Sequence, residues 1–282
     1  MAYEGLIRGI FFFTVLILVG YAETRVARRE LTVSKKGRWF NNLGIIFLSS
    51  LLLKLTVPVA ATGVAAAAEA KGWGLFNLYH LSPWLTIPLS ILILDLVIYL
   101  QHLMFHAVPI LWRLHMVHHA DLDLDVTSGL RFHPLEILLS MGIKMAVVAA
   151  LGIPVIAVLI FEITLNATAM FNHGNIYLPE KVDRLLRLLT VTPDMHRVHH
   201  SVIIRETNSN FGFNFPWWDR ICGTYRDQPV AGHDKMTIGL SQFRSAEQLT
   251  LPKLILLPVN GKIGPYTLKD IGRDPDSIKK SL

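Results

Sequence analysis

The sequence predicts an all-α fold: a bundle of about four to five membrane-spanning helices carrying a helical cap. Three observations lead there. Of 282 residues, 52% are apolar and only 17% are charged, against roughly 25% charged in an average soluble domain; mean hydropathy is +0.42. The apolar residues form long runs, and 12 histidines lie between or beside them. This composition excludes intrinsic disorder, and the single cysteine excludes a disulfide framework or a cysteine-based metal site.

Four apolar stretches account for the predicted spans: Gly5–Tyr21, Leu43–Ala68, Trp84–Met104 and Ile137–Met170. The first three approach the roughly 20 residues that cross a hydrocarbon core. We expect the first to be a retained span and not a cleaved signal peptide, because its cluster of basic residues follows the apolar run. The fourth is too long for one crossing. Its Gly152-Ile153-Pro154 sequence predicts a hairpin of two arms.

Lysine and arginine asymmetry predicts the orientation. The loop between the first two spans carries six basic residues: Arg25, Arg28, Arg29, Lys35, Lys36 and Arg38. The next loop carries only Lys71. The positive-inside rule therefore places the first loop in the cytoplasm. All the histidine motifs then fall on the cytoplasmic side of an integral, multi-pass membrane protein.

The histidines recur at helical spacing. His102 and His106 lie four residues apart in QHLMFH, and an H-x2-HH pattern occurs twice, as His115, His118 and His119 and as His196, His199 and His200. On a helix the i, i+3 and i+4 positions share a face, so each triplet is expected to direct three imidazoles at a metal site. Eight imidazoles exceed what one ion can hold, which implies two metals. Imidazole suits Fe, Zn, Cu or Ni, and without Glu-x-x-His a carboxylate-bridged centre is disfavoured.

These motifs resemble the fatty acid hydroxylase superfamily, also called the sterol desaturase family. Besides the H-x3-H and H-x2-HH motifs, the resemblance includes Asp95 ahead of the first histidine motif, RFHPLE at 131–136, TPDMHRVHHS at 192–201 and WWDRICGTY at 217–225. It covers somewhat under half of the chain, from about Asp95 to Tyr225. It implies a cap that carries a histidine-ligated dimetal site.

The resemblance implies which residues bind metal. Besides the eight histidines above, His173 in FNHGN stands where the family has a further ligand. Ala169 stands where some members have another histidine, so the second metal would use one fewer imidazole, or a water instead. His133 has three readings: a ligand, a partner of a ligand, or a packed residue ahead of Pro134.

Asp95 precedes His102 by seven residues, on nearly the same helix face. A carboxylate inside a span is costly and marks function, so we expect Asp95 to accept the ring N–H of a ligating histidine; the alternative is a charge facing a water-filled cleft. Asp219 and Asn210 are candidates for similar roles near the last motif.

The implied function is a non-haem di-iron oxygenase that uses O2 to hydroxylate or desaturate a lipid, such as a sterol, a fatty acyl chain or a sphingolipid. The chain lacks a Gly-x-Gly-x-x-Gly fingerprint and a recognisable cytochrome-type domain, so electrons are expected from a separate electron-transfer protein. Its net charge of +6 predicts attraction to anionic lipid headgroups. No nucleic-acid motif accompanies the charge.

Two rival functions remain open. One is an ether-lipid hydroxylase like the alkylglycerol monooxygenases, which would depend on a pterin. The other is a metal transporter that uses the histidines as a relay.

We expect three regions: N-terminal spans and a basic loop in 1–82, a catalytic domain in 83–227, and a cytoplasmic or membrane-surface segment in 228–282.

Overall fold

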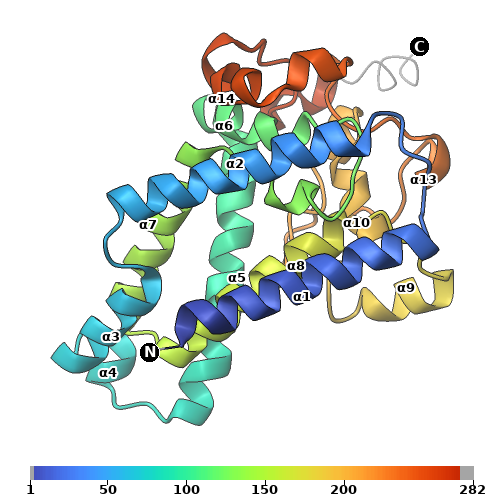
Figure 1. Cartoon of the computed structure of the whole chain (residues 1–282). Coiled ribbons are helices and arrows are strands. Elements are labelled where there is room, and N and C mark those ends of the chain that lie inside the picture. Colours follow the sequence, from blue (N-terminus) through green and yellow to red (C-terminus); the bar gives the residue numbers. More distant parts are fainter. Residues whose placement is uncertain (1–2, 274–282) are drawn as a thin grey trace.

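The computed structural model describes residues 3–273, and helices account for all of its regular structure (Figure 1). The described part contains no extended strand, only the isolated bridges Ala27–Ile176 and Ser201–Ile238. The α-helices are α1 (Glu4–Arg25), α2 (Lys35–Thr56), α3 (Ala61–Lys71), α4 (Leu75–Leu78), α5 (Pro83–Ala107), α6 (Pro109–His119), α7 (Pro134–Leu151), α8 (Val155–His173), α9 (Glu180–Leu186), α10 (Pro193–His199), α11 (Ile204–Thr207), α12 (Trp217–Ile221), α13 (Gly232–Lys235) and α14 (Leu251–Asn260). Within residues 3–273 there are also three 3₁₀ turns: Ser128–Leu130, Ala246–Leu249 and Leu268–Arg273.

Five helical segments within residues 3–273 are long and apolar enough to cross a membrane. They are Glu4–Arg25, Lys35–Leu78, Pro83–Ala107, Pro134–Leu151 and Val155–His173. This confirms the all-α fold with membrane-spanning helices. It also fits an integral membrane protein, since lipid-exposed backbone must satisfy its hydrogen bonds internally and helices do so.

The long fourth stretch is the predicted hairpin. Helix α7 ends at Leu151 and α8 begins at Val155. Gly152 occupies the turn with a φ of +68°, and a Cβ there would lie 2.5 Å from the carbonyl oxygen of Trp73. Both the left-handed backbone and the close approach favour glycine.

The second stretch differs from the expected single run Leu43–Ala68. Helix α2 begins eight residues earlier, at Lys35, and ends at Thr56; a new helix, α3, begins at Ala61. Pro58 lies between them, and its ring and missing N–H explain why the helix cannot continue. The early start places Arg38 inside α2, where it is buried.

The cap elements α6, α10, α13 and α14 gather at the end of the bundle away from α3 and α4 (Figure 1). Two apolar clusters hold these regions together. One packs α3, α5, α7 and α8, and the other joins α6, the C-terminal segment and Ile45 of α2. The LPKLILLP stretch begins α14, which leaves Leu256 and Val259 exposed.

Candidate metal centre

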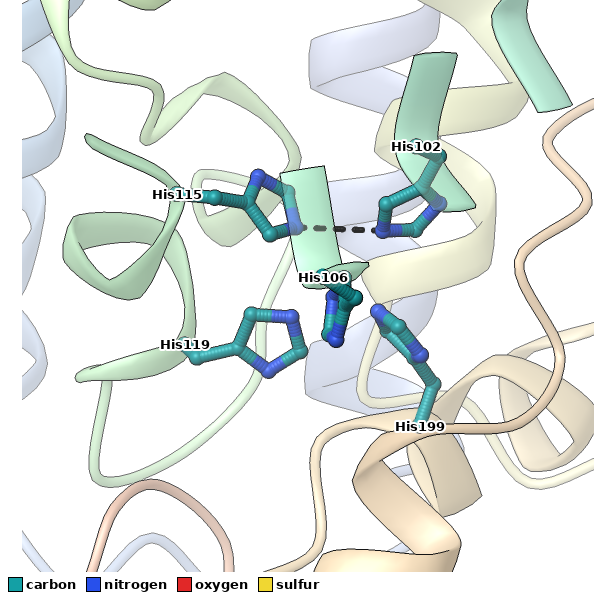
Figure 2. A group of neighbouring side chains, drawn as sticks. All are labelled: His102, His106, His115, His119 and His199. Carbon is teal, nitrogen blue, oxygen red and sulfur yellow. Dashed lines mark hydrogen bonds between the residues drawn. The ribbon is translucent and has the colours of Figure 1, made fainter. Parts of the chain in front are cut away.

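Nine buried histidines form two adjacent groups where α5, α6, α8 and α10 meet. Within each group, one ring nitrogen per residue lies within 4.8 Å of those of all the other members. The first group, drawn in Figure 2, is His102, His106, His115, His119 and His199. The second is His118, His173, His196 and His200. The structure therefore brings together all the histidines of the three motifs, together with His173.

Each H-x2-HH triplet is divided between the two groups, contrary to the expectation that one triplet faces one metal. His115 and His119 belong to the first group, whereas His118 belongs to the second. Likewise His196 and His200 lie in the second group and His199 in the first. Consecutive residues point about 100° apart around a helix, so adjacent histidines reach opposite sides of the α6–α10 contact. The i, i+4 pairs stay together.

Five of the nine imidazoles have their Nδ1 atom fixed by an acceptor outside the two groups. Those acceptors are the Phe211 carbonyl oxygen for His102 at 2.8 Å, Asn208 Oδ1 for His106 at 3.2 Å, Glu136 Oε1 for His115 at 2.7 Å, the Ala169 carbonyl oxygen for His173 at 2.6 Å, and the Ser209 carbonyl oxygen for His199 at 2.7 Å. A carbonyl oxygen only accepts, so Nδ1 carries the proton and Nε2 keeps its lone pair. A lone pair directed inward is what a metal ligand requires.

The inward-facing nitrogens are too close together for hydrogen bonds alone. Nε2 of His173 lies 3.1 Å from Nε2 of His118, 3.1 Å from that of His196 and 3.2 Å from that of His200. One lone pair cannot accept three protons. In the first group, Nε2 of His102 lies 3.1 Å from Nε2 of His115, although both rings donate through Nδ1. Facing lone pairs repel unless a cation lies between them, so the donors fit bound metal ions.

Other ring nitrogens have no hydrogen-bond partner in the described part of the chain, although they are buried. They are Nε2 of His106, Nε2 of His199, both nitrogens of His119, and Nδ1 of His118, His196 and His200. A buried polar atom without a partner costs free energy. Metal coordination would remove that cost for the inward-facing atoms.

Burial also selects the neutral form of the rings. It lowers the pKa of every imidazole in the groups that lies outside the spanning segments, namely His115, His118, His119, His196, His199 and His200. For His118 and His119 neighbouring imidazoles lower the pKa further. Neutral imidazole is the metal-binding form.

Asp95 accepts no hydrogen bond from a histidine, so the prediction that it holds a ligating imidazole is wrong. Its carboxylate accepts the indole N–H of Trp218 at 2.8 Å and the backbone N–H of Asn214 at 3.3 Å. Helix α5 turns the Asp95 side chain toward the 211–218 segment, so it anchors that segment instead. The expected role falls to Glu136, which accepts from His115.

His133 lies outside both groups, and the structure corrects its reading as a possible ligand. It caps the N-terminus of α7: Nδ1 accepts the Leu135 backbone N–H at 3.2 Å, and Nε2 donates to the Ile255 carbonyl oxygen at 3.2 Å. Both ring nitrogens are therefore engaged. Pro134 at the first helical position suits such a cap.

Asp219 does not bind an imidazole itself but holds the backbone segment that does. Its carboxylate accepts the backbone N–H groups of Phe211 and Gly212, both at 2.8 Å. The Phe211 carbonyl in turn holds His102. Burial raises the pKa of the Asp219 carboxyl to about 6, although these hydrogen bonds lower it. Asn210 binds the carbonyl oxygens of Met195 and Arg226, and so ties the loop after the last motif.

A cavity of about 130 Å³ lies beside the histidines. His102, His115 and Glu136 are among the polar residues that line it, and the spanning segments of α5, α7 and α8 supply mostly apolar walls. Phe132, which also lines it, stacks on His118 with the ring centroids 4.2 Å apart. An apolar cavity with a few converging polar groups is the usual form of a small-molecule site.

Several residues of the site were not predicted. Glu136 ends the RFHPLE motif, which carries part of the family resemblance, and Asn208 and Ser209 belong to a polar stretch without a recognisable signature. Three of the five acceptors are backbone carbonyls, which carry no signal in the sequence.

The chain matches one protein family and several known proteins. The fatty acid hydroxylase family model matches residues 87–224. An ornithine lipid hydroxylase of Rhizobium tropici is 24% identical over 225 residues, covering 78% of this chain and 67% of the relative.

Alkylglycerol monooxygenases of Xenopus tropicalis and Homo sapiens are 28% and 29% identical over 208 and 176 residues. These matches cover 71% and 61% of this chain, but the chain spans only 43% and 36% of those two relatives. No solved structure matches the chain.

Proposed function

The chain belongs to the fatty acid hydroxylase superfamily, and on that premise we propose that it is a membrane-bound, non-haem di-iron oxygenase that hydroxylates a lipid. One observation carries the proposal. His102 and His115, from the first of the two adjacent groups of buried imidazoles, line an apolar cavity whose walls are largely spanning helices. A lipid is the substrate class that reaches such a cavity from within a membrane.

Iron is the proposed metal. Five imidazoles and four imidazoles make two ligand sets without sulfur, a donor type that iron, zinc, copper and nickel accept. When bound, a pair of iron ions supplies the redox chemistry by which O2 oxidises a C–H bond. His102, His106, His115, His119 and His199 would hold one ion, and His118, His173, His196 and His200 the other.

The protein contributes orientation and exclusion of water. The acceptors behind Nδ1 fix the imidazole tautomers, so no proton has to leave those rings when metal binds. Phe132 and Phe213 line the cavity and pack against the rings of His118 and His102. They keep the surroundings of the reacting carbon apolar and disfavour water there.

We further propose that a separate electron-transfer protein supplies the reducing equivalents. Arg184 of α9 and Arg220 of α12 are exposed basic residues, and they would attract an acidic partner or anionic lipid headgroups. The excess of basic residues in the 25–38 loop supports placing the metal centre on the cytoplasmic side. The family match at 87–224 supports 83–227 as the catalytic region.

A second candidate within the superfamily is an ether-lipid hydroxylase, because two relatives are alkylglycerol monooxygenases. Purified enzyme that needs a pterin for turnover would favour it. Desaturation is a further outcome of the same C–H oxidation, and the product distinguishes it. A metal transporter would instead move metal ions across the membrane of vesicles that contain the protein.

The test combines metal analysis with lipid profiling. We expect purified protein to hold about two iron ions per chain, since each ligand set suits one ion. Cells that express the chain should contain an O2-dependent hydroxylated lipid that is absent from cells without it. Protein that carries zinc alone and transports it across vesicles, with no oxidised lipid, would refute the proposal.

A further inference from the structure

A second cavity, of about 450 Å³, lies among the spanning segments of α1, α2 and α8. Apolar side chains supply most of its lining, among them Phe12, Leu43, Phe47 and Met170. Phe47 is 66% exposed, so the cavity borders the outer surface of the bundle. In a membrane, that surface faces hydrocarbon.

This cavity adjoins the cavity at the metal centre. Ile46 of α2 and Asn166 of α8 line both. These two side chains therefore lie where the two spaces adjoin, and Ala169 lies about one turn beyond Asn166, toward His173. A chain that lay in the second cavity would reach the histidines by passing these two side chains.

The far end of the second cavity offers no free charge for a headgroup. Arg8 lines that end and is bound by Glu4 at 2.9 Å and by Glu162 at 2.6 Å. Glu162 also pairs with Lys144. The two cations and two carboxylates balance, so a lipid headgroup would gain little there.

The length of the path suits a hydrocarbon chain. His173 and Glu162 lie eleven residues apart on α8, which corresponds to about 16 Å of helix. The histidines are at the end of the helix and Glu162 is inside the span. An amphiphile entering this space would keep its polar end near the histidines and its tail among α1, α2 and α8.

We propose that the second cavity binds the hydrocarbon chain of the lipid substrate and that Ile46 and Asn166 form the passage to the metal centre. This inference rests on the proposed function, and it adds how the substrate lies: the polar end at the metal centre and the tail toward Arg8. The oxidised carbon is then close to the polar end of the lipid.

Photolabelling tests the inference without turnover. The probe is a phosphatidylcholine with a diazirine halfway along one acyl chain, incorporated into vesicles with the metal-loaded protein. We expect labelling near Phe12 and Phe47 to exceed labelling near Leu100, an exposed residue of α5 that lines neither cavity.

A matched pair of substitutions locates the passage. Ile46→Trp should lower the labelling near Phe12 and Phe47 about ten-fold relative to that near Leu100, because the larger ring fills the space of the chain. Leu51→Trp, on the exposed surface of the same helix, should leave it unchanged. Ile46→Ala, which widens the passage, should label at least as strongly as the unsubstituted chain.

Equal labelling of all three regions, or labelling that Ile46→Trp does not lower, would overturn the inference. So would loss of labelling in Ile46→Ala with its metal retained. Labelling and metal content do not depend on oxidation, so a protein that binds the chain in this cavity but oxidises no lipid would refute the proposed function alone.

Discussion

Glu136 illustrates how one residue outside the histidine groups can control the metal. It is the only ionisable side chain among the five acceptors that hold a ring Nδ1, and its Oε1 lies 2.7 Å from Nδ1 of His115. We expect Glu136→Ala to weaken metal binding about 10- to 100-fold, since the imidazole loses the partner that fixes its tautomer. Glu136→Gln should weaken metal binding less, because its amide oxygen can still accept the hydrogen bond from Nδ1–H of His115.

Chelator titration of the purified protein measures this effect independently of activity. Glu180→Ala, which removes an exposed carboxylate, is the control and should retain metal like the unsubstituted chain. Equal metal retention in Glu136→Ala and the control would contradict the assigned role.

The division of each triplet leads to a second prediction. His199→Ala and His118→Ala each remove a member of a different group, so we expect each variant to lose mainly the ion of that group and both to lose activity. His133→Ala is the matched control. It removes a helix cap and should lower stability by about 1 kcal/mol while keeping its metal. Metal analysis and thermal unfolding of the three variants check this, and metal loss in His133→Ala would contradict it.

For single residues, the spacing in the sequence predicted which motif histidines come together, but not how they are divided between the two groups. His118 and His119 are neighbours in sequence, yet they belong to different groups. Which side a ring faces depends on where α10 and α8 pack against α6, and local periodicity does not contain that information. Asp95 was misassigned for the same reason, because its helix face also meets the 211–218 segment.

Among the elements, α2 is tied to the loop after the second histidine motif by Arg38. Its guanidinium binds Asp121 at 2.7 and 2.9 Å and Asp125 at 2.7 Å, and all three side chains are buried. Arg38 holds the pKa of the Asp121 carboxyl well below its usual range, although burial opposes this. The loop that follows His119 is thus fixed to a spanning helix.

We expect Arg38→Ala to lower the free energy of unfolding by about 3–5 kcal/mol, because it leaves buried carboxylates without their cation. Lys36→Ala, an exposed change two residues away, should alter it by less than about 0.5 kcal/mol. Denaturant unfolding in detergent compares the two variants. Similar values for both would show that the ion pairs add nothing to stability.

The sequence marked Arg38 only as one of six charges that set the orientation. Its burial could not be anticipated, because the apolar run begins at Leu43 and the preceding residues resemble a polar loop. The hairpin was predictable, since glycine and proline act locally. Pro58 also marks the break between α2 and α3 in the sequence, but it lies inside a continuous apolar stretch, which predicted a single span.

For the molecule as a whole, the orientation in the membrane can be tested with its own thiol. Cys222 is the single cysteine; it is exposed and follows α12 in the segment whose Asp219 supports the metal centre. We expect a membrane-impermeant maleimide to label intact cells poorly and opened cells well, because the metal centre is proposed to face the cytoplasm. The Cys222→Ser variant is the negative control. Strong labelling of intact cells would show that the metal centre faces the outside, contrary to the proposal.

The two ligand groups draw on residues from His102 to His200, across four helices. Both need α10, which follows the α7–α8 hairpin in the chain and packs against α8. Metal capture is thus a late event in the biogenesis of the protein, and it stabilises only molecules that have completed their topology. When the metal is scarce, the newly made chain would keep its imidazole lone pairs facing one another, without the stabilisation that metal binding supplies. Cellular quality control would then remove it, so the abundance of the protein should follow the metal supply even if its synthesis does not change.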